Sequence, residues 1–171
     1  MPRRFLILDA CVIIDFVEVD RTLFKIVRDA VGVVHVATRV LHNEVTKLDA
    51  SDVEALGVKL VTPSLAMMSE AALAGGGLSP RDWVCVLLAE ERGWTCVSND
   101  KRMRAECTRR SVDVLWGLEL IAMAVEAGAL PATAAGDVGR EICRLNPRMT
   151  AAVLAAFLKR VAAARRGGRR G

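Results

Sequence analysis

The 171-residue chain contains no tyrosine, and aromatic residues make up only 4% of it. Stacking of nucleic-acid bases on aromatic side chains is therefore not expected to dominate ligand binding. With only His35 and His42 available, a zinc site built from histidine and cysteine is disfavoured. No run of about 18 uninterrupted apolar residues occurs, so no transmembrane helix is expected and the predicted location is the cytoplasm.

The five cysteines lack the spacing of a disulfide framework or of a metal-binding motif. Their number is odd, no two stand in a CxxC pair, and most lie inside apolar runs. This pattern favours reduced, buried thiols in an intracellular protein. Hydrophobic residues make up 53% of the chain, enough for a full core, and the net charge of +4 permits an anionic partner without requiring one.

Short apolar runs alternate with longer helical patterns through the first three quarters of the chain. Strands are predicted at residues 5–8, 33–37, 58–61, 95–97 and 112–116. Helices are predicted at residues 21–30, 38–48, 65–74, 80–92, 101–110 and 118–127. Such alternation is typical of an α/β protein with a parallel sheet, here of about five strands, flanked by helices.

Beyond Pro131 the pattern becomes wholly helical. Segments are predicted at 132–144 and 149–164, with a break at Asn146-Pro147. The last residues are rich in arginine and glycine and are not expected to fold alone. We therefore divide the chain into a domain of residues 1–130, a helical extension of residues 131–164 and a flexible basic tail of residues 165–171.

Four acidic residues are predicted at the carboxyl edge of the sheet, where open parallel sheets bind ligands. Asp9 follows the first strand, Glu44 lies in the helix after the second, Asp82 is the third residue of the helix from Pro80, and Asp100 follows the fourth strand. Carboxylates gathered in this way repel one another unless a divalent cation neutralises them. Hard oxygen ligands without imidazole or thiolate indicate Mg²⁺ or Mn²⁺.

Each acid alone also has a purely structural interpretation. Asp100 fits the N-cap of the following helix, Asp82 fits a first-turn acid that interacts with the helix dipole, and Glu44 fits a solvated helix residue. Asp9 fits such an interpretation least, because a carboxylate between two apolar runs is expected to be buried and to need a partner. Asp15 is expected at a helix end or on the surface.

The segments FLILDACVIID, HNEV and LSPRDWVCVLLAEERGWTCVSNDKRM resemble the PIN-domain ribonucleases. In that family an Asp follows strand one, a Glu follows strand two, an Asp opens the central helix, and an Asp lies in a T/S-N-D turn. The pattern falls in order on Asp9, Glu44, Asp82 and Asp100, within roughly residues 3–125. The resemblance implies a PIN-like fold and Mg²⁺- or Mn²⁺-dependent cleavage of RNA, with these four residues as metal ligands and catalytic groups. Ser98 and Asn99 would support them, Ser98 through a hydrogen bond to a water at the metal.

Two positions depart from the family pattern, and the family contains more than one kind of nuclease. Cys11 stands where many members have Asn, Ser or Thr, and Arg102 stands where some carry a further acid. Many members are VapC-type toxins that a small antitoxin protein neutralises, and others are solitary RNA-processing nucleases. Both versions remain open for this chain, with a homodimer as the expected assembly. The alternative is a non-catalytic PIN-like scaffold or RNA-binding module.

Two basic clusters are weak candidates for RNA contact. The first follows Asp100 and contains Arg102, Arg104, Arg109 and Arg110. The second, in the tail, contains Arg165, Arg166, Arg169 and Arg170. Their alternative interpretation is a solubilising surface, and the dependence of RNA affinity on salt separates the two.

Overall fold

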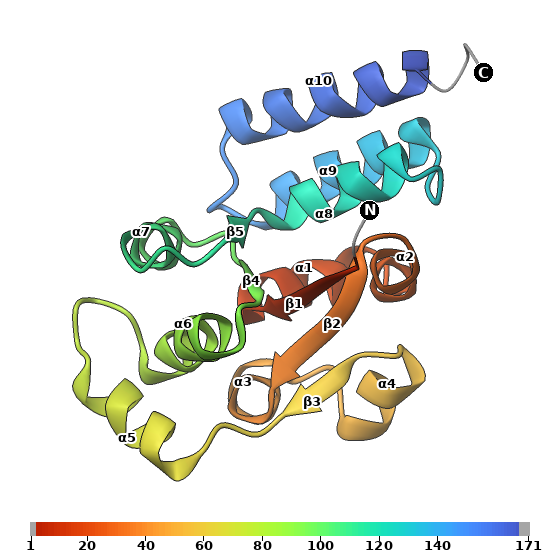
Figure 1. The fold of residues 1–171 in the computed structure, drawn as a ribbon. Coiled ribbons are helices and arrows are strands. Elements are labelled where there is room, and N and C mark those ends of the chain that lie inside the picture. The colour runs from red at the N-terminus through yellow and green to blue at the C-terminus, as the bar shows by residue number, and fades with distance from the viewer. Residues whose placement is uncertain (1–2, 168–171) are drawn as a thin grey trace.

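In the computed structural model, which describes residues 3–167, five parallel strands form one sheet flanked by helices (Figure 1). The side chains of Asn43, Glu44 and residues 165–167 lie outside the described part. The strands are β1 (Arg4–Leu8), β2 (Gly32–Ala37), β3 (Lys59–Val61), β4 (Thr95–Val97) and β5 (Val114–Leu115), in the order β3-β2-β1-β4-β5. The predicted α/β fold class, a parallel sheet of about five strands flanked by helices, is confirmed.

The helices of the described chain lie close to the predicted ones, with two additions. They are α1 (Ala10–Val19), α2 (Thr22–Ala30), α3 (Thr38–Glu44), α4 (Ala50–Ala55), α5 (Leu65–Leu73), α6 (Pro80–Arg92), α7 (Lys101–Arg109), α8 (Gly117–Glu126), α9 (Ala132–Leu145) and α10 (Ala151–Gly167). The sequence did not predict α1 or α4, and α3 ends four residues earlier than expected. Capping explains both additions, because Asp9 caps α1 and Asp49 forms a capping box with Asp52 at α4.

The central strand β1 lies between β2 and β4, and its last three residues are buried. Leu6 is in register with Val34 of β2 on one side and with Thr95 of β4 on the other. Leu6, Ile7 and Leu8 are all fully buried, as expected for a strand inside a parallel sheet. Because β1 and β4 end side by side, the residues that follow them are neighbours at the carboxyl edge.

The helix α6 forms as its sequence predicts. Ser79 is the N-cap, Pro80 takes the first helical position, and Gly93 ends the helix in the left-handed conformation at φ 63°. Every residue from Trp83 to Ala89 is buried, which confirms the expectation drawn from its continuous apolar run. The helix packs against β1 and β4, and its first turn reaches the carboxyl edge of the sheet.

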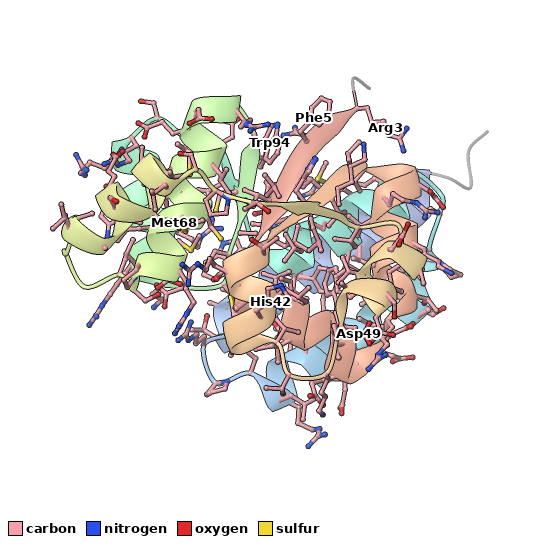
Figure 2. The ribbon with its side chains drawn as sticks, turned by 90° about the horizontal axis from the view of Figure 1, so that it is seen from below. Arg3, Phe5, His42, Asp49, Met68 and Trp94 are labelled. Carbon is pink, nitrogen blue, oxygen red and sulfur yellow. The ribbon has the colours of Figure 1, made fainter. Side chains whose placement is uncertain are left out.

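Aromatic residues gather near the amino ends of β1 and β4 (Figure 2). The ring of His35 stacks on Trp94 with 4.0 Å between the ring centroids, and Phe5 lies beside both. The Nδ1 atom of His35 lies 3.1 Å from the carbonyl oxygen of Leu6. Burial lowers the pKa of His35. This histidine is therefore a core residue, as expected.

The C-terminal extension forms a helical layer on one side of the molecule, with α10 outermost in Figure 1. Helix α10 packs on both α8 and α9, and a Cβ atom at Gly139 would lie only 2.3 Å from Cε1 of Phe157. Helix α10 continues to Gly167, so the start of the predicted tail is helical, whereas residues 168–171 lie outside the described part. The loop between α9 and α10 returns to the carboxyl edge of the sheet.

All five cysteines are free, and Cys85, Cys96 and Cys107 are buried, which confirms the predicted burial for three of the five. Within residues 3–167, none of the helices has both the length and the apolar character needed to cross a membrane.

Candidate active site

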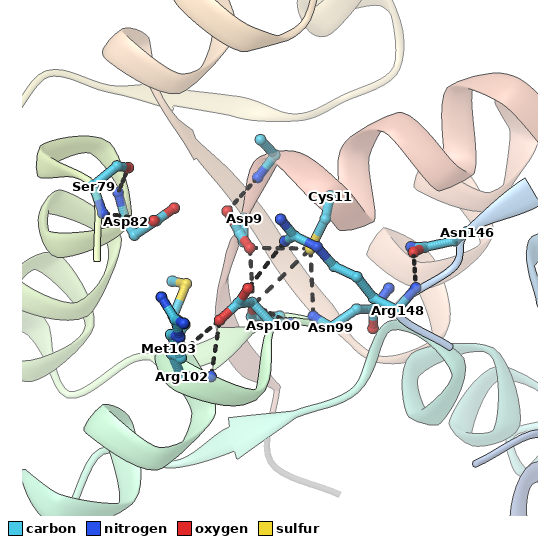
Figure 3. A network of polar contacts seen from close by, with 12 residues as sticks. Asp9, Cys11, Ser79, Asp82, Asn99, Asp100, Arg102, Met103, Asn146 and Arg148 are labelled. Atoms are coloured by element: carbon cyan, nitrogen blue, oxygen red, sulfur yellow. Dashed lines mark hydrogen bonds and ion pairs between the residues drawn. The ribbon is translucent and has the colours of Figure 1, made fainter. Parts of the chain in front are cut away.

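A cavity of about 630 Å³ opens at the carboxyl edge of the sheet, and three predicted acids line it (Figure 3). Asp9, Asp82 and Asp100 come to this cavity from the start of α1, the first turn of α6 and the turn between β4 and α7. The loop between α9 and α10 supplies the remaining wall. The fourth predicted acid, Glu44, ends α3, and its side chain lies outside the described residues.

Asp9 is the most deeply buried of the three acids, with 3% of its surface exposed. Its Oδ1 accepts a hydrogen bond from the Ala10 amide at 2.7 Å, and Oδ2 accepts bonds from Ser98 Oγ at 2.8 Å and Cys11 Sγ at 3.0 Å. Burial raises the pKa of Asp9 and the charge of Asp82 raises it further, although the three hydrogen bonds act in the opposite direction. A cation in the cavity would relieve this unfavourable charge.

Asp82 combines a capping role with a place on the cavity. Its amide donates to Ser79 Oγ at 3.2 Å, and its Oδ2 accepts from the Ser79 amide at 2.9 Å, which completes a capping box. Figure 3 shows its carboxylate directed toward Asp9. The structural interpretation as a helix cap is therefore confirmed, and the same side chain also lines the cavity.

Asp100 likewise uses one carboxylate oxygen for its helix and the other for the cavity. Oδ1 accepts hydrogen bonds from the amides of Arg102 at 2.9 Å and Met103 at 3.0 Å, so Asp100 is the N-cap of α7. Oδ2 forms an ion pair with Nη1 of Arg148 at 3.1 Å. The cap was anticipated in the sequence, whereas the arginine partner was not.

Ser98 and Asn99, the predicted supporting residues, connect the acidic turn to the rest of the fold. Ser98 is fully buried; its hydroxyl donates to Asp9 and accepts from the Asp100 amide at 3.0 Å. Asn99 donates from Nδ2 to Asp15 Oδ2 at 2.8 Å and accepts at Oδ1 from the Gly117 amide at 3.0 Å. One serine hydroxyl therefore fixes two of the candidate acids relative to each other.

The expectation that Asp15 lies at a helix end or on the surface is wrong. The residue lies in the middle of α1 with 6% of its surface exposed. Asn99 and Asn146 both donate side-chain amide hydrogens to its carboxylate, the latter at 3.0 and 2.9 Å. Burial raises the pKa of Asp15 to about 6, although these amide hydrogen bonds lower it. The partners stand 84 and 131 residues away in the chain, so no local sequence signal indicates them.

The basic residues after Asp100 have partners within the protein itself, and their contact with RNA stays a prediction. The candidates were Arg102, Arg104, Arg109 and Arg110. Glu106 pairs with Arg109 at 2.5 Å and with Arg110 at 2.9 Å, because helical spacing places all three on one face. The guanidinium of Arg104 lies 4.0 Å from the centre of the Trp116 ring. The Nη1 atom of Arg102 lies 3.4 Å from the carbonyl oxygen of Gly77. The arginine that lines the acidic cavity is Arg148.

The donor chemistry of the cavity suits a hard divalent cation, although its side chains are spread apart. Asp9, Asp82 and Asp100 offer carboxylate oxygens, the ligands that Mg²⁺ and Mn²⁺ prefer. Among the described side chains, no three His, Cys, Asp or Glu residues lie close enough together to hold one ion. One of these acids, Asp100, already has a cationic partner in Arg148.

Comparisons with known proteins support the fold. No protein-family model matches the sequence, and no curated protein gives a significant match. A solved structure of a PilT N-terminus (PIN) domain protein from the hyperthermophilic archaeon Sulfolobus solfataricus P2 is similar, with a TM-score of 0.53 and 14% sequence identity. The alignment covers 70% of this chain and 92% of that chain. At this level of identity the likeness shows the fold alone: the chain has a PIN-like α/β fold.

Proposed function

We propose that this protein is a Mg²⁺- or Mn²⁺-dependent endoribonuclease that hydrolyses RNA phosphodiester bonds. Its metal-binding and catalytic residues are Asp9, Glu44, Asp82 and Asp100. The observation that carries the proposal is the arrival of three carboxylates from three separate elements on one cavity at the carboxyl edge of a parallel sheet. The PIN-like fold and the burial of Asp9 support it.

The residues of the chain provide a prepared acidic surface for this reaction. Asp9, Asp82, Asp100 and Glu44 would hold the ion, which supplies polarisation of a phosphodiester and activation of water. Ser98 holds Asp9 at 2.8 Å and the Asp100 amide at 3.0 Å, so these two acids keep their relative position. Such fixed polar groups need little reorganisation when charge develops during the reaction.

The proposal has two biological versions that use the same catalytic residues. In the first, the protein is a toxin, and a small antitoxin protein is its partner. In the second, it is a solitary RNA-processing or RNA-decay nuclease. Both versions include RNA as the substrate and a homodimer as the assembly. The gene immediately upstream separates them, because toxin genes usually adjoin the genes of their antitoxins.

A non-catalytic PIN-like scaffold or RNA-binding module is the competing proposal, and two observations favour it. Asp82 and Asp100 both satisfy helix ends, which is a sufficient structural reason for their presence. In addition, the described acids do not form a compact metal cluster. A scaffold is expected to show neither stabilisation by Mn²⁺ nor cleavage of RNA.

Cleavage of a mixed RNA pool by the purified chain is expected in Mn²⁺ or Mg²⁺ and not in EDTA. The reason is that the carboxylates alone repel the phosphate backbone, whereas an ion bound to them attracts it. The measurement is gel analysis of RNA fragments, together with the melting temperature as a function of Mn²⁺ concentration. Equal cleavage with and without EDTA would exclude the metal-dependent reaction, and the absence of both effects would favour the scaffold.

Deletion of residues 165–171 is expected to weaken RNA binding to a similar extent for all sequences, without abolishing cleavage. The deletion removes four arginines, and each lost phosphate contact should reduce the slope of log affinity against log salt by about 0.7 for single strands. The measurement is RNA affinity across a salt series. A chain that ends at Gly167 is the control, because it keeps all of α10 and loses only two of the four arginines. An unchanged affinity and slope would make the tail a solubilising surface.

A further inference from the structure

Arg148, in the loop between α9 and α10, contributes a positive charge to a cavity whose other charged lining residues are acids. Its Nη1 atom pairs with Asp100 Oδ2 at 3.1 Å, and 55% of the side chain is exposed. An exposed ion pair of this kind is weak and exchanges readily. The guanidinium has five N–H donors, and the structure uses one nitrogen for Asp100, so further donors remain for a ligand.

The loop that carries Arg148 is held in place by buried polar contacts. Asn146 is 8% exposed and donates to both carboxylate oxygens of Asp15. The same side chain accepts a hydrogen bond from the Arg148 amide at 2.9 Å. The extension is therefore attached to α1 directly beside the cavity, and the position of the arginine follows from this attachment.

The charges around the cavity make Arg148 the group there that can attract a phosphate. Asp9, Asp15, Asp82 and Asp100 all line the cavity and would repel the phosphate of an approaching nucleic acid. Arg109 and Arg110, which are predicted to contact RNA, do not line this cavity, and both pair with Glu106. A planar guanidinium matches two phosphate oxygens at once, which a single ammonium group does not.

We propose that Arg148 of the C-terminal extension binds a backbone phosphate of the RNA in this cavity. Without ligand, the arginine neutralises Asp100. When Asp100 contributes to a cation site, the arginine is released and its donors contact the phosphate beside the acids. This inference rests on the proposed function, and it makes the helical extension a part of the substrate site.

The test compares Arg148→Gln with Arg144→Gln in the full chain. Both changes remove one positive charge from the extension; Arg144 is 66% exposed, pairs with Glu141 on α9 and does not line the cavity. Two quantities are measured: the Mn²⁺ concentration at half-maximal thermal stabilisation without RNA, and the dissociation constant of a labelled single-stranded RNA in Ca²⁺. A gel verifies that the RNA remains intact in Ca²⁺.

Opposite effects on the two ligands are expected for Arg148→Gln. The Mn²⁺ midpoint should fall by about twofold to fivefold, because Asp100 no longer has a competing partner. The RNA dissociation constant should rise by about tenfold, because charge-assisted hydrogen bonds to a phosphate are lost. Arg144→Gln should change the Mn²⁺ midpoint by less than about twofold and weaken RNA binding only slightly.

Two results would overturn the inference: an unchanged RNA affinity in Arg148→Gln, and an equal loss of RNA affinity in Arg144→Gln. If the first is accompanied by a lower Mn²⁺ midpoint, the arginine is a counter-ion for Asp100 alone. Failure of the wild-type protein to cleave RNA would instead contradict the proposed function, and the RNA affinities in Ca²⁺ would still decide the role of Arg148.

Discussion

Asp9→Asn is expected to abolish metal-dependent cleavage and, at neutral pH, to make the protein more stable. The change keeps the shape of the side chain and removes a buried charge that a metal ion would use. A metal ion contributes several kcal/mol to the stabilisation of a phosphoryl transition state, so the rate should fall on the order of 10²-fold or more. The amide can still accept from Ala10 and donate to Ser98 and Cys11, whose rotatable O–H and S–H groups can reverse their direction.

The gain in stability should depend on pH. Burial raises the pKa of Asp9 above the usual 3.8, so the folded protein retains a proton that the unfolded chain releases. The contribution of Asp9 to the free energy of unfolding is therefore greatest at low pH, and it falls as the pH rises through the folded-state pKa. Asp9→Asn cannot ionise and so avoids this loss. The excess of its free energy of unfolding over that of wild type should be small near pH 4 and larger near pH 7.

Urea unfolding at a series of pH values, together with initial cleavage rates, measures both effects. Asp137→Asn is the matched control, because Asp137 lies on α9 with 83% of its side chain exposed. This control should change stability by no more than about 0.5 kcal/mol and leave cleavage unaffected. Mn²⁺ should raise the melting temperature of wild type much more than that of Asp9→Asn. Full activity in Asp9→Asn would mean that the acids serve only as caps and turns.

The fold was predictable because its signals are local. The apolar run of β1, the Ser79–Pro80 start of α6 and the glycine that ends it all act within a few residues. The helix α1 was missed because its β-branched, apolar residues are equally compatible with a continued strand. Only the cap from Asp9 and burial against the remaining core show that the segment is a helix.

The candidate site was predictable only as far as the topology determines it. The ends of parallel strands share one edge, which is why Asp9 and Asp100 could be assigned to the same region. The residues supplied by the extension could not be identified, because their partners are remote in sequence. Asn146 contacts Asp15, 131 residues away, and Arg148 pairs with Asp100 of a different element. The partners of the basic cluster are by contrast local, since Glu106 lies one helical turn from Arg109 and Arg110 and pairs with both.

Asn146→Ala is expected to destabilise the protein by about 1.5–3 kcal/mol at pH 7, the usual contribution of hydrogen bonds to a charged group. The substitution removes a donor at 3.0 and 2.9 Å from the two oxygens of Asp15 and leaves that buried carboxylate with Asn99. It also removes the oxygen that accepts from the Arg148 amide. The loop between α9 and α10 should then be less ordered beside the cavity.

The size of this effect should increase with pH. Burial raises the pKa of Asp15 from 3.8 to about 6. The hydrogen bonds from Asn146 partly offset this rise, because they favour the ionised form of Asp15. In Asn146→Ala the pKa of Asp15 should therefore rise further. Ionisation of this carboxyl at higher pH then lowers the free energy of unfolding more in the variant than in wild type. The difference between wild type and Asn146→Ala should therefore be smaller near pH 4.5 than above about pH 6.

Urea unfolding at pH 4.5 and pH 7.5 measures the effect, and Arg144→Ala provides the control. Arg144 forms a surface ion pair two residues before Asn146, and its loss should cost no more than about 1 kcal/mol. Combining Asn146→Ala with Asp15→Asn completes a double-mutant cycle. In the Asp15→Asn background, Asn146→Ala should cost less stability, because no buried charge remains at residue 15. Additive costs, or a loss of stability that is equal at both pH values, would show that Asn146 acts through loop packing and not through the Asp15 carboxylate.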